Sequence, residues 1–494
     1  MLTEIEQARL RRSLATDPAR KARLGQFLTP ARTAAFMASM FPPSEGDCRL
    51  LDAGAGIGSL SVAFVDRWKR GELGFDRVDV DAFELDATLH GDLTRSLAAC
   101  DNGRLSFAVH GGDFVEQASA SVAGDMFAAA LPRYSHIILN PPYKKISSDS
   151  THRLALRRAG IETVNLYSAF VALAVALAAP GGQIVAIIPR SFCNGPYYRH
   201  FRSFILDRAA IRHIHLFDAR NKAFKDDDVL QENVIIRLER DGQPGPVTVS
   251  TSTDDTFSDV AIHDHPFCRI VHSDDSERFV HIPAGPEATA LELSSAVRCT
   301  LAELGVSVST GPIVDYRLKE HLRDAPVEGS VPLLYPAHFS GGSMSWPILG
   351  MKKPNAIMLN EDSRRWMYPT GTYCVVRRFS SKEEARRIVA SVVNPEAFGD
   401  ARVLGFENHL NVFHADGGGL PVDLAHGLAA FLNTSAVDEA FRRFNGHTQV
   451  NATDLRRMKY PSVETLTEIG RWAARHGEPP TQTLLDQQLL KATA

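Results

Sequence analysis

Short apolar runs recur along the first half of the chain, and each one ends in small or polar residues. Four of them are predicted as strands: 49–51, 78–83, 105–109 and 136–139. Between the first two, residues 60–68 place apolar side chains at helical spacing. Strands that alternate with helices in this way are typical of a doubly wound, mostly parallel sheet. We therefore expect an α/β domain over residues 25–245.

The rest of the chain is predicted as two further parts. Residues 1–24 are charged and are expected to form a helical extension. A Gly/Pro turn cluster at 241–246, followed by a Ser/Thr/Asp-rich stretch at 250–259, indicates a domain boundary. Beyond it, residues 246–494 show weaker periodicity, which favours a mixed α/β domain.

A glycine-rich turn, Asp-Ala-Gly-Ala-Gly-Ile-Gly at 52–58, follows the first predicted strand. It is not a P-loop, because no Gly-Lys-Ser/Thr follows, and its third glycine comes one residue early for G-x-G-x-x-G. Asp52 at the start of this turn suits a ligand with a cationic amino-acid part better than a pyrophosphate, which a carboxylate would repel. The turn therefore predicts a nucleoside site without a phosphate cradle.

Two carboxylates end the next two strands. Glu84 follows the second strand, where an acid can accept both hydroxyls of a ribose. Asp113 follows the third, where it could accept from an adenine amine while Phe114 packs on the ring. Taken alone, each carboxylate is better explained as a solvated loop residue, but their order at successive strand ends favours a binding site.

The segment Asn-Pro-Pro-Tyr at 140–143 follows the fourth strand. Proline has no N–H for the ladder, so the strand must end there and present these residues at its carboxyl edge, where open α/β sheets bind ligands. Two hydrogen-bond acceptors and an aromatic ring suit a planar exocyclic amine. For the motif alone, a turn that merely closes a strand is the alternative.

Together these motifs resemble the N6-adenine DNA methyltransferases of restriction–modification systems, in the group with gamma motif order. Segments 25–30, 52–58 and 182–189 match this order, with Phe224 in the position of a second aromatic. The resemblance implies a Rossmann-like fold that binds S-adenosylmethionine through Gln26, Phe27, Thr29, Pro30, Asp52, Ala53, Gly54, Gly56, Glu84, Leu85, Asp113, Phe114, Asn140 and Pro142. It implies catalysis by Asn140, Pro141, Pro142 and Tyr143, with Tyr143 and Phe224 stacking on a flipped-out adenine.

Asn140 would act by hydrogen bonding. Its side-chain oxygen and the Pro141 carbonyl would each accept one N6–H, which localises the nitrogen lone pair for in-line attack on the methyl group. No metal and no strong base are expected, and positioning supplies most of the barrier reduction.

The second half resembles the PstI-like modification methylases, in segments 308–312, 378–383, 406–411 and 445–456. Enzymes of that kind methylate adenine in CTGCAG, so this half is expected to be the domain that recognises double-stranded DNA. Asn and Gln suit adenine and Arg suits guanine. The densest set of such groups is Asn445, His447, Gln449, Asn451, Arg456 and Arg457. The alternative is that this segment is a structural turn packed on a sheet.

Composition and charge limit the kinds of binding surface, metal site and cellular compartment that are expected. The net charge of −4 means that any DNA-binding surface is local, and most of the basic pairs lie in the second half. The six cysteines are scattered without a C-x-x-C, which argues against a zinc site or a disulfide framework and fits a reducing cytoplasm. No secretory signal and no apolar run of membrane-spanning length is found.

Three competing functions use related motifs. A protein-glutamine methyltransferase shares Asn-Pro-Pro-Tyr but lacks a long second domain. An RNA base methyltransferase would prefer single strands or loops. A non-enzymatic DNA-binding subunit conflicts with the intact glycine loop. A fused nuclease is not expected with about 24 residues before the first motif, so a separate restriction endonuclease is expected to share the site.

Overall fold

The computed structural model describes residues 2–15, 28–217, 232–283, 285, 287, 291, 294–380, 383–446, 448–476 and 482–493. The chain divides into two compact units, Met1–Pro286 and Glu287–Ala494. Each unit has its own sheets and its own buried core.

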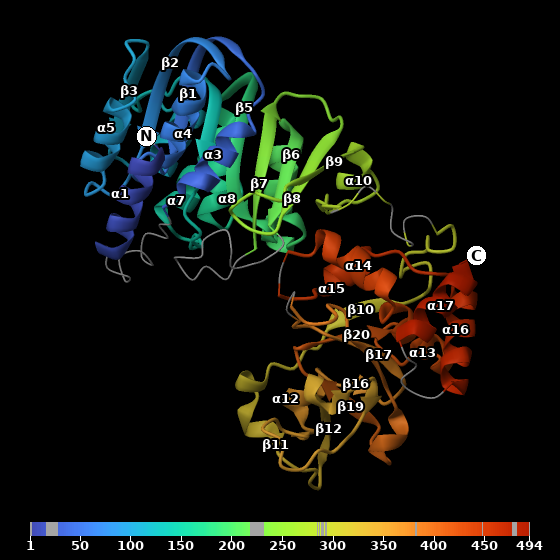
Figure 1. Ribbon diagram of the computed structural model, residues 1–494. Coiled ribbons are helices and arrows are strands. Elements are labelled where there is room, and N and C mark those ends of the chain that lie inside the picture. The colour runs from blue at the N-terminus through green and yellow to red at the C-terminus, as the bar shows by residue number, and fades with distance from the viewer. Residues whose placement is uncertain are drawn as a thin grey trace. The chain divides into compact units, whose positions relative to one another are not determined.

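The first unit is built on a nine-stranded sheet in the order β3-β2-β1-β4-β5-β7-β6-β8-β9 (Figure 1). The strands are β1 (Glu45–Ala53), β2 (Gly74–Phe83), β3 (Leu105–His110), β4 (Tyr134–Leu139), β5 (Ala178–Pro189), β6 (Ala209–Phe217), β7 (Asn233–Arg240), β8 (Val247–Ser252) and β9 (Ala261–His265). The first five run parallel to one another, and β7 is antiparallel to both β5 and β6. The four predicted strands are therefore confirmed and lie side by side.

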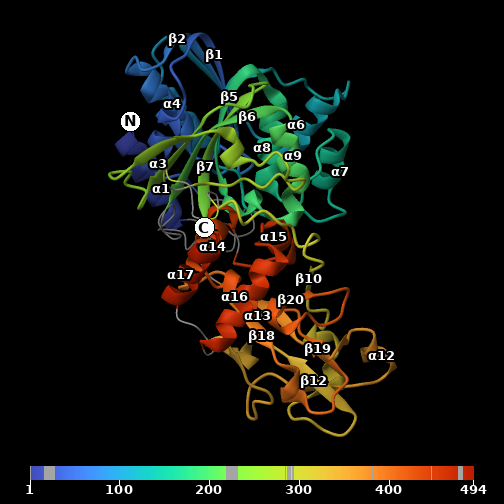
Figure 2. The same ribbon diagram turned by 90° about the vertical axis from the view of Figure 1, so that its right-hand side faces the viewer.

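Helices cover both faces of this sheet (Figure 2). They are α1 (Leu2–Ala15), α3 (Ala31–Ser39), α4 (Ser59–Lys69), α5 (His90–Ala98), α6 (Phe114–Ala123), α7 (Thr151–Arg158), α8 (Leu166–Leu177), α9 (Arg199–Leu206) and α10 (Phe267–Ile270). The helix predicted at 60–68 is α4.

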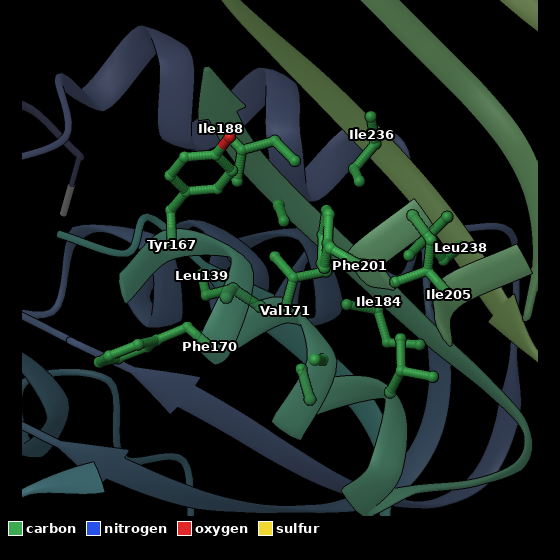
Figure 3. Packing of buried hydrophobic residues seen from close by; sticks show 14 of the residues in the cluster. Leu139, Tyr167, Phe170, Val171, Ile184, Ile188, Phe201, Ile205, Ile236 and Leu238 are labelled. Atoms are coloured by element: carbon green, nitrogen blue, oxygen red, sulfur yellow. The ribbon is translucent and has the colours of Figure 1, made fainter. Parts of the chain in front are cut away.

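Alternate residues of each strand serve the two faces, as the pleat requires. In β4, Ile138 joins the core under α3, α4 and α5, whereas Ile137 and Leu139 join the core under α6, α8 and α9. Figure 3 shows the second core, in which side chains of α8 and α9 interlock with those of the strands: Phe170, Val171, Phe201, Ile205, Ile184 and Leu238.

The first unit extends beyond the predicted boundary at residue 245. β8 pairs in parallel with β6, and β9 pairs with β8. The Ser/Thr-rich stretch that indicated a linker begins inside β8. Its residues Ser250 and Ser252 are buried and hydrogen-bonded to histidines of β6. Composition alone could not distinguish this strand from a linker.

The N-terminal helix also belongs to the first unit. The side chain of Ile5 in α1 is buried in the core that α3 and α4 share. Glu6 accepts a hydrogen bond from the backbone N–H of Ala31, and Arg12 pairs with Asp92 of α5. The described part of the predicted extension is therefore packed against the sheet domain.

The second unit contains a four-stranded sheet, β10-β20-β17-β18, and a five-stranded sheet, β11-β15-β12-β19-β16. The strands are β10 (Ser307–Thr310), β11 (Leu322–Arg323), β12 (Ser330–Leu334), β13 (Phe339–Ser340), β14 (Ser343–Met344), β15 (Ala356–Met358), β16 (Tyr368–Pro369), β17 (Tyr373–Arg377), β18 (Ala390–Val393), β19 (Val403–Phe406) and β20 (Leu410–His414). The helices are α12 (Glu361–Arg364), α13 (Val422–Leu432), α14 (Ser435–Phe444), α15 (Ala452–Arg457), α16 (Val463–Arg475) and α17 (Gln482–Thr493). In the described part of the chain, no helix is both long and apolar enough to cross a bilayer.

Candidate active site

The glycine-rich turn connects β1 to α4 and needs its glycines. Gly54, Gly56 and Gly58 all have positive φ, at 80°, 59° and 91°, a region that residues with a side chain rarely adopt. A Cβ on Gly56 would also lie 2.9 Å from the Leu28 side chain. The turn is held to the neighbouring strand because the Gly54 N–H donates to the Phe83 carbonyl over 2.9 Å.

Glu84 ties this turn to the end of β2. One carboxylate oxygen accepts from the Gly56 N–H (2.8 Å), and the other accepts from the Asp86 N–H (2.7 Å). Burial raises the pKa of Glu84 above its ordinary value, although the two N–H donors act in the opposite direction. Each carboxylate oxygen has a second lone pair, so Glu84 can hold the turn and also accept from a ligand in the pocket that it lines.

Asp113 caps α6 and pairs with a histidine. One oxygen accepts from the Glu116 N–H (3.1 Å), and the other lies 2.8 Å from His152 Nε2. Burial alone would raise the pKa of Asp113, but the hydrogen bond and charge of His152 and the backbone N–H groups of Glu116 and Val115 together outweigh it, so the pKa is lowered. The pKa of His152 is correspondingly raised by its hydrogen bond to Asp113. Asp113 is thereby held as a carboxylate, which is a hydrogen-bond acceptor.

Asn140 is the first residue after β4, and its amide has a fixed orientation. Its Nδ2 donates to Thr29 Oγ1 over 3.0 Å, and its Oδ1 lies 3.4 Å from the Tyr143 hydroxyl. The same hydroxyl lies 3.3 Å from the Ile187 carbonyl of β5. Burial raises the pKa of Tyr143 well above the ordinary value for tyrosine, so the ring is a neutral phenol.

These strand ends surround one pocket. The predicted residues that line it are Thr29, Gly54, Gly56, Glu84, Leu85, Asp113, Phe114, Asn140 and Pro142. Two aromatic rings add to its apolar wall, since Phe114 and Phe170 lie 5.0 Å apart between ring centroids. The predicted residues Gln26, Phe27 and Phe224 lie outside the described part of the chain.

His152, Lys144 and Phe170 also line the pocket, and the sequence analysis missed them. Lys144 directly follows Tyr143, a position that could have indicated it. Phe170 lies in the almost wholly apolar helix α8, where no pattern marks the position that faces the pocket. His152 reaches Asp113 only through the folding of α7 against α6.

Asp52 does not line the pocket, and its cofactor-binding role stays a prediction. Its side chain is fully buried beneath the turn, and one oxygen accepts from both the N–H and the hydroxyl of Ser61 (3.2 and 2.6 Å). Burial raises the pKa of Asp52 to about 7. Asp52 therefore fixes the start of α4 through Ser61, and its neighbour Ala53 is buried at the end of β1. Pro30 likewise lies outside the lining and precedes α3.

In the second unit, the structure gives two residues predicted to read DNA bases a structural role. The side chain of Asn445 is 1% exposed, and its amide bonds to Arg387, to the Gln449 carbonyl and to Asp454. Asn451 caps α15 together with Asp454. These amides hold a buried turn, which was the alternative interpretation of the segment.

The other described residues predicted to read DNA bases are less buried than Asn445. Arg456 is exposed, although one of its nitrogens donates to the Val308 carbonyl over 3.0 Å. Gln449 is half-buried, with its side-chain oxygen 3.4 Å from Arg378. His447 lies outside the described residues.

Comparison with known proteins identifies the family. The family described as Eco57I restriction-modification methylase matches residues 114–224. The chain is 50% identical over 473 residues to the Type II methyltransferase M.BsuBI of Bacillus subtilis, covering 95% of this chain and 94% of that protein. It is 41% identical over 461 residues to the Type II methyltransferase M.PstI of Providencia stuartii, covering 92% and 90%.

A solved structure agrees with this chain in fold. The Type IIL restriction-modification enzyme MmeI, solved in complex with DNA, aligns with a TM-score of 0.51 and 10% identity, over 100% of this chain and 73% of that one. The predicted doubly wound methyltransferase fold followed by a mixed α/β region is confirmed. With two relatives above 40% identity over nearly the whole chain, this protein belongs to the Type II DNA methyltransferases of restriction–modification systems.

Proposed function

We propose that this protein transfers a methyl group from S-adenosylmethionine to N6 of a flipped-out adenine in a short duplex site, CTGCAG. The observation that carries the proposal is Asn140, whose side-chain oxygen is oriented beside a pocket that also exposes Glu84 and Asp113. The modification would protect DNA from a separate restriction endonuclease that cuts the same site.

The pocket residues fit the proposed cofactor. Glu84 provides acceptors for ribose hydroxyls at the end of β2, and Asp113 provides an acceptor for an adenine amine at the end of β3. Phe114 and Phe170 offer apolar surface for a purine ring. Gly56 lines the same pocket and lets the turn pass close to Leu28, where a Cβ would lie 2.9 Å from that side chain. When bound, S-adenosylmethionine supplies an electrophilic methyl group.

Asn140 prepares the adenine amine. Asn140 Nδ2 donates to Thr29, and its Oδ1 accepts from the Tyr143 hydroxyl over 3.4 Å, so the oxygen is the acceptor atom of this amide and has two lone pairs. This oxygen and the Pro141 carbonyl would each take one N6–H, so the nitrogen lone pair is withdrawn from the ring and becomes nucleophilic. The polar groups are oriented before the reaction, which is the main source of stabilisation in sites of this kind. The proton lost from N6 can pass to water, since an amide is not a base.

The adenine must leave the stack to reach Asn140. Tyr143 carries a neutral ring three residues from Asn140, and we assign it to stacking against the extruded base, with Phe224 on the opposite side. Such stacking contributes about 1–3 kcal/mol per base. The second unit, residues 287–494, is assigned to recognising the duplex site.

The test is methyl transfer from labelled S-adenosylmethionine to plasmid DNA, bulk RNA and protein extract offered in parallel. The modified DNA would then be sequenced for N6-methyladenine. We expect label in DNA at the adenine of CTGCAG. Label in RNA or protein alone would contradict the DNA substrate, and label at another DNA motif would contradict the site.

Asn140→Ala separates the chemistry from binding. The variant should lose methyl transfer by at least 100-fold, because the N6 amine loses its acceptor, in line with the loss of one oriented polar group at other sites. Its affinity for S-adenosylhomocysteine, measured by calorimetry, should stay within a few-fold of the parent. Near-normal turnover would show that Asn140 is not the acceptor.

A further inference from the structure

A half-exposed histidine in the second unit is held by a fully buried carboxylate. The side chain of Glu407 is 0% exposed, and that of His409 is 42% exposed. One Glu407 oxygen is bonded to His409 Nδ1 at 2.5 Å, and the other accepts from the His409 backbone N–H at 2.9 Å. Glu407 thus holds both the backbone and the ring of His409, which fixes the orientation of the ring. The second ring nitrogen, Nε2, can then contact another partner.

The burial of Glu407 needs a reason. Taking a carboxylate out of water costs free energy unless it is paired and hydrogen-bonded. Burial indeed raises the pKa of Glu407, while the bonds from His409 oppose the shift. Glu407 lies directly after β19, where its N–H donates to the Leu334 carbonyl. A carboxylate at this position serves to orient His409 rather than to meet solvent.

Three neighbours extend His409 into a patch. The backbone N–H of Arg378 donates to the His409 carbonyl (2.8 Å), and the Arg378 guanidinium reaches the Asn408 carbonyl (3.1 Å) and the Gln449 side chain (3.4 Å). Phe379 is 39% exposed, with its ring centroid 4.9 Å from that of His409. We call Arg378, Phe379, His409 and Gln449 the His409 patch.

We propose that the His409 patch contacts base edges in a groove of the target DNA and helps to determine the methylated sequence. This inference rests on the proposed function. It names His409 as a specificity-determining residue and Glu407 as its positioning residue.

The chemistry of the patch matches a base pair. With its Nδ1–H donated to Glu407, a neutral His409 presents Nε2 as an acceptor, which suits the amine of adenine or cytosine. A protonated His409 presents an N–H donor, which suits guanine N7 or O6. Gln449 suits adenine and Phe379 suits the methyl group of thymine. The cation of Arg378 suits the negative potential of DNA.

The test compares His409→Ala with the parent and with His476→Ala. His476 is also exposed, at the end of α16 and outside the patch, so it is a matched control. Each protein would methylate the same unmethylated plasmid, and sequencing for N6-methyladenine would give the ratio of modification at the cognate site to that at sites differing by one base pair. We expect His409→Ala to lower this ratio about tenfold, the effect of one lost base contact.

Glu407→Gln tests the positioning role. It keeps one acceptor for the two N–H groups of His409 and removes the charge, so the ratio should fall in the same direction and by less. Affinity for S-adenosylhomocysteine should be unchanged in both variants, since the cofactor pocket lies in the first unit.

The outcomes separate the two proposals. A His409→Ala protein with the parental ratio would overturn the inference and leave the proposed function intact. A loss of thermal stability in Glu407→Gln with an unchanged ratio would show a structural role alone and would also overturn the positioning role. A parent protein that methylates no DNA would overturn the proposed function, and the inference with it.

Discussion

At the scale of single residues, the orientation of one amide decides whether Asn140 can act as an acceptor. A side-chain amide can turn over and exchange its oxygen and nitrogen. The hydroxyl of Thr29, 111 residues earlier in the chain, accepts from Asn140 Nδ2 and holds the plane of the amide in place. The resemblance assigned Thr29 to the cofactor alone, and its hydrogen bond to Asn140 adds a second role.

We therefore expect Thr29→Val to lower turnover. Valine has nearly the shape of threonine but no hydroxyl, so the amide of Asn140 loses its partner. The loss of one hydrogen bond of about 1 kcal/mol corresponds to a roughly fivefold fall in kcat. Steady-state kinetics on plasmid DNA would measure it. Thr29→Ser keeps the hydroxyl and should retain most of the activity. Equal kinetics for both variants would contradict this role.

His152 gives a second prediction at this scale. Its Nε2 lies 2.8 Å from an Asp113 oxygen, and its hydrogen bond and charge help to lower the pKa of that carboxyl group. His152→Ala should raise the KM for S-adenosylmethionine roughly tenfold, as expected for a lost bond to a charged group. The kcat at saturation should change little, because Asn140 is unaffected.

Two controls accompany this variant. His200→Ala removes an exposed histidine of α9 and should leave the KM unchanged. His152→Gln, which can still donate to Asp113, should recover part of the loss. If His152→Ala lowered kcat and left the KM alone, the histidine would act on the catalytic loop instead.

The site residues that could be predicted are the polar or acidic residues that follow a predicted strand. Glu84, Asp113 and Asn140 each follow an apolar run, so their common edge follows from the pattern. Asp52 meets the same criterion and yet faces Ser61, since the pattern does not tell which side of a turn a side chain takes. His152 meets no criterion, because its contact with Asp113 joins two different helices.

At the scale of elements, the parallel strands were predictable and the far edge of the sheet was not. A strand buried on both faces reads as an apolar run, as in β4. β8 instead buries two serines against His213 and His215, so its composition resembles that of a loop. This loop-like composition is why the domain boundary was predicted at residue 245, whereas the first unit extends to residue 286.

Helices α13 and α16 of the second unit meet at glycines. A Cβ on Gly427 would lie 1.8 Å from the Leu466 carbonyl oxygen, and a Cβ on Gly470 would lie 1.8 Å from that of Asp423. Close backbone approach of this kind excludes any side chain. The two helices can pack only with glycine at both positions.

Gly427→Ala should therefore destabilise the protein by at least about 2 kcal/mol, because backbone atoms must move apart. Urea unfolding would measure it. Gly91→Ala in α5 is the control, since a Cβ there meets no atom within 4 Å. The control should be neutral or gain up to about 1 kcal/mol from helix propensity. Equal stability of the two variants would contradict the close packing.

At the scale of the whole molecule, the large sheet carries histidines that burial keeps neutral. His215 is 0% exposed, and its two ring nitrogens lie 2.9 Å from Ser250 Oγ and 3.1 Å from Ser252 Oγ. Burial lowers the pKa of His215 from 6.5 to about 3. The pKa of His136, on the same sheet, is likewise lowered by burial to about 4.

Because its pKa is lowered in the folded state, His215 makes the protein less stable as the pH falls. The folded protein binds no proton at His215 above pH 5, whereas the unfolded chain begins to bind one below pH 6.5. The contribution to stability is therefore complete above pH 6.5 and is lost as the pH falls toward 3, by about 1.4 kcal/mol per pH unit. Asp52, with its raised pKa, acts in the opposite direction but is common to parent and variant.

His215→Gln removes this titration and keeps a side chain that can bond to the serines. The variant should be less stable than the parent at pH 7.5, and the gap should shrink by about 2 kcal/mol at pH 5. Urea unfolding at the two pH values would measure both gaps. His476→Gln, which alters an exposed histidine, should show the same gap at both. A His215→Gln gap that stayed constant would mean that His215 is protonated in the folded protein, and that the serines accept from an imidazolium.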